Sequence, residues 1–223
     1  TVVSGSIGSL DSAICADTIN ISQDSIVNAE VCPWFTGNPT TITISDSSVS
    51  GEVWGTGEGS ITIENSTIYN GDISGTQVSV TRSEISGNVQ SDVFTATGST
   101  ITGNINSPEQ LGLSNNRVTL DNTITQSVWG TYLAIKNNSR VQGNINEGAT
   151  NSVFYSEVSV TSSNIAGTVE GTYVTVNSGY LSNSVTGEFE ITINGGTFDG
   201  EVKSRDFTIK NGVFNSTVGP YDD

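Results

Sequence analysis

The 223-residue chain contains no histidine and only two cysteines. The absence of histidine excludes a Ser/His/Asp or Cys/His catalytic arrangement. Two cysteines without histidine give little support to a zinc site, which usually has four such ligands. Catalysis by a pair of carboxylates, as in glycosidases, is still possible without histidine. Because no column of Asp or Glu accompanies the repeat described below, the sequence predicts no catalytic residue and no cofactor.

Basic residues are also scarce, since 7 Lys and Arg stand against 23 Asp and Glu, for a formal net charge of −16. Nucleic acid and anionic membrane surfaces would repel such a chain, so neither is an expected partner. No apolar run is long enough to span a bilayer, and no membrane insertion is predicted. Hydrophobic residues make up only 34% of the chain, which suits a fold whose core is a single thin column.

A short repeat covers nearly the whole chain. Residues 61–73 (ITIENSTIYNGDI), 78–89 (VSVTRSEISGNV) and 94–105 (FTATGSTITGNI) carry apolar residues at offsets 0, +2, +7 and +11 or +12. Self-similarity at a fixed short period indicates a solenoid. Eleven copies, here called rungs, open at Ile19, Ile42, Ile61, Val78, Phe94, Val118, Leu133, Val158, Val174, Ile191 and Phe207.

The alternation within each rung predicts strands, because Ile-Thr-Ile and Val-Ser-Val place alternate side chains on one face. The predicted fold is all-β: a single-stranded parallel β-helix of about eleven rungs, each with three short strands. The second strands contribute a second apolar column: Ile26, Val49, Ile68, Ile85, Ile101, Ile124, Val141, Ile165, Leu181, Phe198 and Phe214. The third strands contribute a third column: Val31, Val53, Ile73, Val89, Ile105, Val128, Ile145, Val169, Val185, Val202 and Val218.

The repeat sets the expected domain boundaries. Residues 1–18 precede the first clear rung and are expected to cap or start the solenoid, because an open end exposes unpaired strand edges. Residues 19–219 form the β-helix domain, and residues 220–223 are a tail or the start of a linker to an anchoring or pilin domain. A glycine precedes the third strand in most rungs, as at Gly71 and Gly87. It predicts a position without room for a Cβ, or one with positive φ.

Cys15 and Cys32 are separated by about one rung. Neighbouring strands lie about 4.8 Å apart, which is within the Cα separation that a disulfide accepts. We therefore predict a disulfide and, with it, an exported protein. The alternative is a pair of free thiols in a cytoplasmic protein. Thr1 in place of Met is consistent with a removed signal peptide.

The connection after the third strand varies in length, and all long insertions leave at the same corner of the rung. Among solenoids, such a decorated face is often the binding face. All three Trp and six of the thirteen other aromatics fall in these connections, with acids and amides between them. The candidate ligand-binding residues are Trp54, Trp129, Tyr132, Phe154, Tyr155, Tyr173, Glu147 and Glu157.

Flat rings beside carboxylates and amides suit a sugar, which stacks its C–H face and bonds through its hydroxyls. Trp129 and Tyr132 are the best single targets, because their connection is too short to fold over its own rings. The alternative is that each ring pins its loop to the solenoid. Glu30, Glu52 and Asp72 occupy consecutive outward positions, and we interpret them as a solvated acidic edge and not as a Ca²⁺ site.

The Gly-Asn-Ile and Gly-Glu-Val rungs, with their Ser/Thr-rich alternation, resemble exported bacterial β-helix surface proteins of the passenger-type and fibre-tip adhesins. The resemblance spans Ile19 to Val218 and implies a secreted or cell-surface, monomeric adhesin domain that binds a glycan or a host-cell receptor. A polysaccharide-degrading lyase or hydrolase on the same fold is the alternative. A rank of outward Thr residues resembles ice-binding solenoids, and the short rungs resemble filament-forming bactofilins, so those two functions stay open as well.

Overall fold

The computed structural model describes residues 2–3, 5–7, 13–34, 38–107, 116–147 and 155–220. The chain forms two units, Thr1–Ile105 (unit 1) and Asn106–Asp223 (unit 2). Within the described ranges, both units consist of β-strands. None of these residues belong to a helix that is long and apolar enough to span a membrane.

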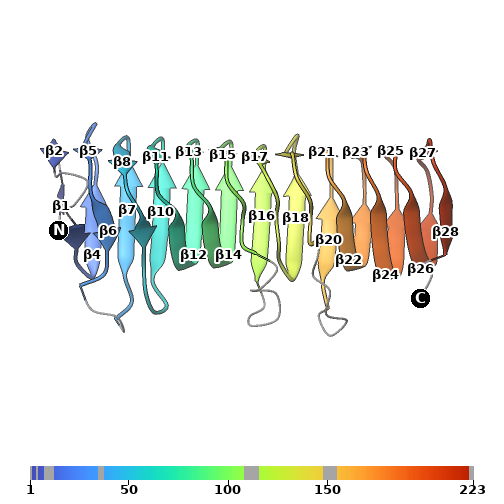
Figure 1. Cartoon of the computed structure of the whole chain (residues 1–223), viewed down its shortest axis with the longest axis horizontal. Helices are drawn as coiled ribbons and strands as arrows, with labels where there is room; N and C mark the ends of the chain where they lie inside the picture. Colours follow the sequence, from blue (N-terminus) through green and yellow to red (C-terminus); the bar gives the residue numbers. More distant parts are fainter. Residues whose placement is uncertain are drawn as a thin grey trace. The chain divides into compact units, whose positions relative to one another are not determined.

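Unit 1 is a β-solenoid in which each strand pairs in parallel with its equivalent one turn later (Figure 1). The first strands of its turns are β1 (Val2–Val3), β4 (Thr18–Ile21), β7 (Thr41–Ser45), β10 (Ser60–Glu64), β12 (Ile73–Thr81) and β14 (Val89–Thr97). The second strands are β2 (Ser6–Ile7), β5 (Ile26–Val27), β8 (Ser48–Ser50), β11 (Thr67–Tyr69), β13 (Glu84–Ile85) and β15 (Thr100–Ile101). The third strands are β3 (Ala13–Cys15), β6 (Glu30–Cys32) and β9 (Val53–Trp54), followed by the opening residues of β12 and β14.

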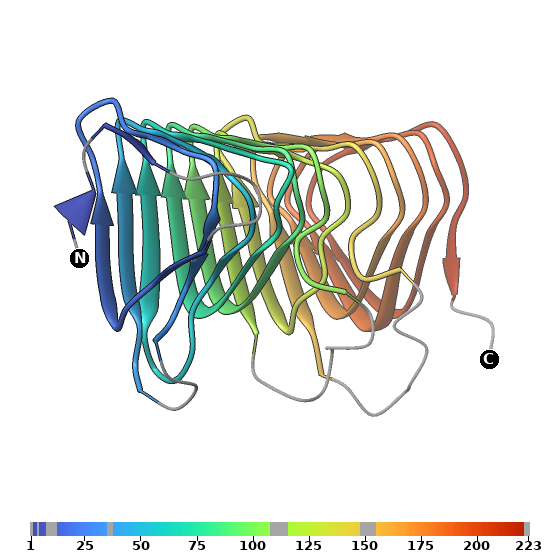
Figure 2. The same cartoon turned by 60° about the vertical axis from the view of Figure 1, so that its left-hand side comes forward.

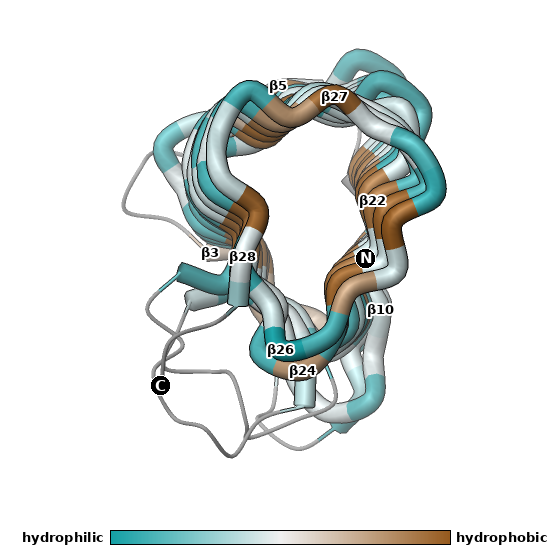
Figure 3. The backbone as a smooth tube through the Cα atoms, turned by 90° about the vertical axis from the view of Figure 1, so that its right-hand side faces the viewer, coloured by the Kyte–Doolittle hydropathy of each residue, from teal (hydrophilic) through white to brown (hydrophobic). Residues whose placement is uncertain are grey.

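Unit 2 repeats this arrangement. Its first strands are β16 (Arg117–Asp121), β18 (Tyr132–Lys136), β20 (Glu157–Val160), β22 (Val169–Val176), β24 (Val185–Ile193) and β26 (Val202–Ile209). Its second strands are β17 (Ile124–Thr125), β19 (Arg140–Val141), β21 (Ser163–Ile165), β23 (Gly179–Leu181), β25 (Thr197–Phe198) and β27 (Val213–Phe214). Seen end-on, β22 and β27 lie on different walls around one interior, and β28 (Val218–Pro220) continues the third-strand wall (Figure 3).

The prediction of a parallel β-solenoid is therefore confirmed. All eleven predicted first strands are present, five in unit 1 and six in unit 2. The segment expected to cap the solenoid contains three short strands, β1 to β3, which pair with β4 to β6.

The three apolar columns are buried as predicted, with two exceptions in the second column. Ile26 is 49% exposed and Val27 fills the interior position, because Val27 pairs with Val49. Likewise Ile124 is 39% exposed, and the buried residue of β17 is the next one along the chain, a threonine. In both cases the strand is only two residues long, and a shift of one residue exchanges its faces. The column members in the last turn are not fully buried, because no described turn follows to cover them.

Several third and first strands are fused, which the sequence did not predict. In β12, β14, β22, β24 and β26 the chain runs from the third wall into the first wall without leaving the strand. This occurs where the connection is short, since too few residues remain to form a separate turn. Figure 2 shows the fused strands of unit 1 lying beside the separate strands that precede them.

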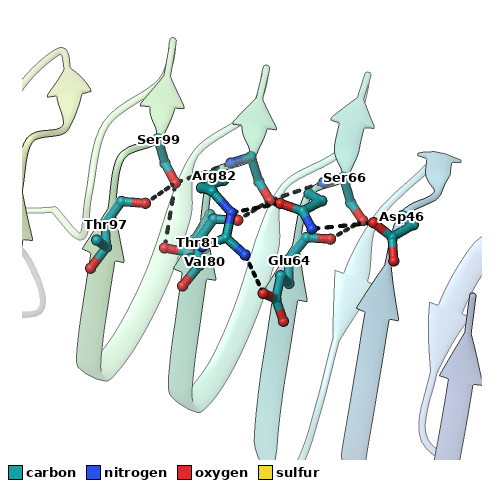
Figure 4. A network of polar contacts seen from close by, with 10 residues as sticks. Asp46, Glu64, Ser66, Val80, Thr81, Arg82, Thr97 and Ser99 are labelled. Atoms are coloured by element: carbon teal, nitrogen blue, oxygen red, sulfur yellow. Dashed lines mark hydrogen bonds and ion pairs between the residues drawn. The ribbon is translucent and has the colours of Figure 1, made fainter.

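The corner between the first and second strands is held by a ladder of buried serines (Figure 4). From Ser47 onward, each Oγ donates to the carbonyl two residues earlier and accepts the backbone N–H of the serine one turn before. The Ser66 Oγ, for example, donates to Glu64 O and accepts from Ser47 N, at 3.2 Å. The ladder in unit 1 comprises Ser25, Ser47, Ser66, Ser83 and Ser99. Because the hydroxyls satisfy buried N–H groups, every turn depends on its neighbour.

Close approach of neighbouring turns explains the recurrent glycine before the third strand. A Cβ built on Gly71 would lie 2.0 Å from the carbonyl oxygen of Gly51, and one on Gly87 would lie 2.1 Å from that of Gly71. Neither glycine has positive φ. Lack of space is therefore the reason for glycine at these two positions.

The predicted disulfide is present. Cys15 on β3 pairs with Cys32 on β6 in the parallel register, and the two Cα atoms are 4.6 Å apart. The bridge joins adjacent turns of the third wall, as the one-rung spacing indicated.

Candidate ligand-binding surface

The two described tryptophans among the candidate residues are held by hydrogen bonds to the solenoid. Trp54 in unit 1 is half-buried, and its indole N–H donates to the Glu30 carboxylate. Trp129 in unit 2 is also half-buried, and its indole N–H donates to the Glu147 carbonyl at 2.9 Å. The Glu147 side chain accepts a hydrogen bond from Asn144. Both indoles are therefore oriented by hydrogen bonds to neighbouring turns, and both remain partly exposed.

The candidate tyrosines are brought together in a row of aromatic rings along unit 2. The ring centroids of Tyr132 and Tyr155 are 6.2 Å apart, and those of Tyr155 and Tyr173 are 5.4 Å apart. The row continues to Phe189, whose centroid lies 6.1 Å from that of Tyr173 with nearly parallel planes. These four residues are called the aromatic ladder below. They come from four consecutive turns, those of β18, β20, β22 and β24.

The ladder remains open to solvent although its rings contact one another. Tyr155 is 48% exposed, Tyr173 37% and Phe189 44%, and Tyr132 is half-buried. Large aromatic side chains are normally buried, so a contiguous row of exposed rings is a candidate binding surface.

The parallel register places the rings in one row. Tyr132 pairs with Glu157, Glu157 with Tyr173, and Tyr173 with Glu190. Since this register position faces outward, its side chains lie along one line at the start of the first wall. Tyr155 precedes Glu157 by two residues and adds its ring from the connection.

Phe189 reaches the row through a β-bulge. β24 carries one extra residue between Gly187 and Glu190, relative to both β22 and β26. An extra residue bends the strand and redirects a side chain. Here the bulge contains Phe189, and its ring stacks on Tyr173.

A guanidinium group covers each end of the ladder. The Cζ atom of Arg117 lies 4.7 Å from the centroid of the Tyr132 ring, and that of Arg205 lies 5.2 Å from the centroid of Phe189. Such cation–π contacts hold the terminal rings in place. The end faces of the row are thus occupied, and a ligand would contact the rings from the solvent side.

Carboxylates are interspersed with the rings, at Glu157, Glu190 and, one turn further, Asp206. The Tyr155 hydroxyl donates to the Glu157 carboxylate, and this bond raises the pKa of Tyr155 to about 12. The phenol therefore stays neutral at all physiological pH values, and it is available as a hydrogen-bonding group.

Part of the predicted surface lies outside the described residues. Phe154 and the interiors of the two long insertions, 108–115 and 148–154, are in this category. The candidate residues predicted from the sequence did not include Phe189, Arg117 or Arg205. The signal for Arg117 was available, because it directly precedes the first apolar residue of its rung, as Tyr132 does in the next.

Two carboxyl groups of unit 2 have lowered pKa values. Hydrogen bonds from Tyr180 and Asn215 lower the pKa of Asp199, and Lys203 lowers that of Glu201. Among the described residues, no group of three or more His, Cys, Asp or Glu side chains is arranged to hold a metal ion.

Comparison of the chain with protein-family models, with curated proteins and with solved structures finds no match in any of the three.

Proposed function

We propose that this chain is a non-catalytic adhesin domain that binds a glycan on a cell surface through the aromatic ladder of unit 2. The observation that carries the proposal is the exposure of Tyr155, Tyr173 and Phe189, side by side on three consecutive turns. Exposed aromatic anchors of this kind dominate the energy of many binding surfaces.

The chemistry of the surface supports a glycan as the ligand. Aromatic rings give a sugar apolar contact, and the phenol of Tyr155 with the carboxylate of Glu157 offers polar partners for its hydroxyls. A protein partner is less well suited, because the centres of protein–protein interfaces are depleted of charged residues. Here carboxylates are interspersed with the rings.

The disulfide supports the proposed location. Cys15 and Cys32 are bridged, and disulfides persist mainly in oxidising compartments. An exported, surface-displayed protein fits both this bridge and a glycan-binding role.

The experiment is a glycan array and a cell-binding assay with the wild type, Tyr173→Ala and Tyr69→Ala. Tyr173 is the central ladder ring, and Tyr69 in unit 1 is a matched control because it is equally exposed, at 39%. Loss of a stacking aromatic commonly costs about 2 kcal/mol, so the affinity of Tyr173→Ala should fall about thirtyfold. Both variants should keep the wild-type thermal midpoint.

Two results would refute the proposal. If folded Tyr173→Ala binds as well as the wild type, the ladder is not the binding surface. If the wild type releases reducing ends from a polysaccharide panel, the chain is an enzyme, and the alternative of a lyase or hydrolase applies.

A further inference from the structure

A flat strip of small polar residues runs beside the aromatic ladder, on the outer face of the first wall of unit 2. Its members lie two residues after the register position of Tyr132 and Tyr173, and each pairs with its equivalent on the next turn. They are Thr119, Ala134, Ser159, Thr175, Thr192 and Thr208. None has a side chain larger than threonine, so the strip lies lower than the rings beside it. We call it the floor.

A third row borders the floor on the side away from the ladder, two residues further along each strand. The Asn194 amide donates to the Asn177 side-chain oxygen at 2.7 Å, and the Asn177 amide donates to the Thr161 hydroxyl at 3.0 Å. On an earlier turn of the row, Lys136 forms an ion pair with Asp121. The hydrogen bonds between turns fix these side chains before any ligand arrives, which lowers the entropic cost of binding.

The aromatic ladder, the floor and this third row, called the amide row below, run in the same direction. Each consecutive turn adds one member to each of them. The ladder repeats at intervals of 5.4 to 6.2 Å between ring centroids. A compact ligand would use one or two turns and leave the other exposed rings uncontacted. An extended polymer can make the same contact on every turn, and its affinity increases with the number of contacts made at once.

Building on the proposed function, we propose that the ligand is an uncharged linear polysaccharide that lies lengthwise along unit 2, on the floor, with one flank against the aromatic ladder. The floor and the amide row bind hydroxyl groups, and the ladder contacts the C–H surface of the sugars. The polysaccharide crosses at least the four turns from Tyr132 to Phe189.

The absence of charge on the polymer follows from the charges that line its path. Glu157, Glu190 and Asp206 occupy the register position of the ladder, and they would repel a uronic acid or a sulfated sugar. Of the cations next to the path, Arg117 and Arg205 lie on the terminal rings, Lys136 is paired with Asp121, and Lys210 lies on the last turn. An anionic polymer would therefore meet carboxylates on several turns.

The test is calorimetry with cello-, manno- and chito-oligosaccharides from the disaccharide to the hexasaccharide, and with an oligogalacturonate hexasaccharide at low salt. For the series that binds, affinity should rise at least about tenfold from disaccharide to hexasaccharide. The oligogalacturonate should bind at least about tenfold more weakly than the neutral hexasaccharide.

A variant of the floor separates this inference from the proposed function. Thr175→Arg places a long side chain on the floor and leaves the buried columns unchanged. Thr62→Arg, at the equivalent outward position of β10 in unit 1, is the matched control. Thr175→Arg should weaken hexasaccharide binding about tenfold. Unchanged binding would show that the polymer does not cross the floor, while the adhesin proposal would still depend on the Tyr173→Ala result. The control should bind as the wild type does.

The inference is overturned if the disaccharide binds as tightly as the hexasaccharide, since the site is then compact, although the adhesin proposal would survive through the Tyr173→Ala result. It is overturned equally if oligogalacturonate is preferred, or if no oligosaccharide of the panel binds. Cell binding that is lost after protease treatment of the cells, but kept after periodate oxidation, would identify a protein ligand and refute both proposals.

Discussion

Substituting alanine for Gly87 tests how closely adjacent turns approach. A Cβ at this position would lie 2.1 Å from the carbonyl oxygen of Gly71, and 2.8 Å from a carboxylate oxygen of Asp72. The first of these neighbours is backbone, so it cannot rotate away. The two turns would have to separate by about 1 Å to restore a normal contact.

The cost of this separation follows from the bonds that cross the gap. The Asn88 N–H donates to Asp72 at 2.7 Å and the Ile73 N–H donates to the Asn88 carbonyl at 2.9 Å. Stretching two hydrogen bonds costs about 1 kcal/mol each, and overpacking adds about 1 to 3 kcal/mol. We expect Gly87→Ala to lose about 3 kcal/mol of unfolding free energy, and its thermal midpoint to fall by about 10 °C.

Urea unfolding followed by circular dichroism measures this loss, with Gly219→Ala as the control. A Cβ on Gly219 would meet no atom within 4 Å, so the control should stay within about 0.5 kcal/mol of the wild type. If Gly87→Ala is as stable as the control, the turns do not approach as closely as described, and the spatial explanation for these glycines is wrong.

Three further predictions concern side-chain contacts. Glu157→Gln should lower the pKa of Tyr155 from about 12 toward its usual value near 10 in an ultraviolet titration. Because that pKa is raised in the folded protein, the contact stabilises the wild type below about pH 10 and ceases to do so as the pH rises through about 12; an unchanged titration would show that the contact does not form. Intact mass should show no alkylation of Cys15 and Cys32 without reduction, and reduction should cost about 3 kcal/mol; two alkylated thiols would contradict the bridge and weaken the case for export. Ser83→Ala should lose about 1 to 3 kcal/mol, because it leaves a buried N–H of the preceding turn without an acceptor; a loss below about 0.5 kcal/mol would mean that water replaces the hydroxyl.

The sequence predicts most of the fold because apolar residues recur at the same inward-facing positions in successive rungs. Columns with several rungs of strict alternation, such as the one through Ile61, Val78 and Phe94, are buried as expected. The errors occur in strands of two residues. β5 contains two adjacent apolar residues, and β17 contains Ile124 beside a threonine. Two residues are too few for an alternating pattern to show which side chain faces the interior.

The candidate site was only partly predictable, for a different reason. The register needed to align Tyr132 with Tyr173 is present in the repeat, and both were selected. Two features, however, depend on three-dimensional contacts that no spacing reports: the bulge that exposes Phe189, and the hydrogen bond that holds Trp129 against the solenoid. The short connection predicted an exposed Trp129 indole. Instead, the indole is half-buried and donates to the Glu147 carbonyl.

Each ring of the aromatic ladder comes from a separate turn, so the length of this surface depends on the number of turns. Equivalent positions on successive turns, such as Val158 and Val174, are 16 residues apart in the chain. Inserting or deleting one such period would leave every buried column in register, whereas changing a strand by one residue would exchange its faces. The number of aromatic rings in the ladder can therefore be increased or decreased by whole turns without redesigning the core.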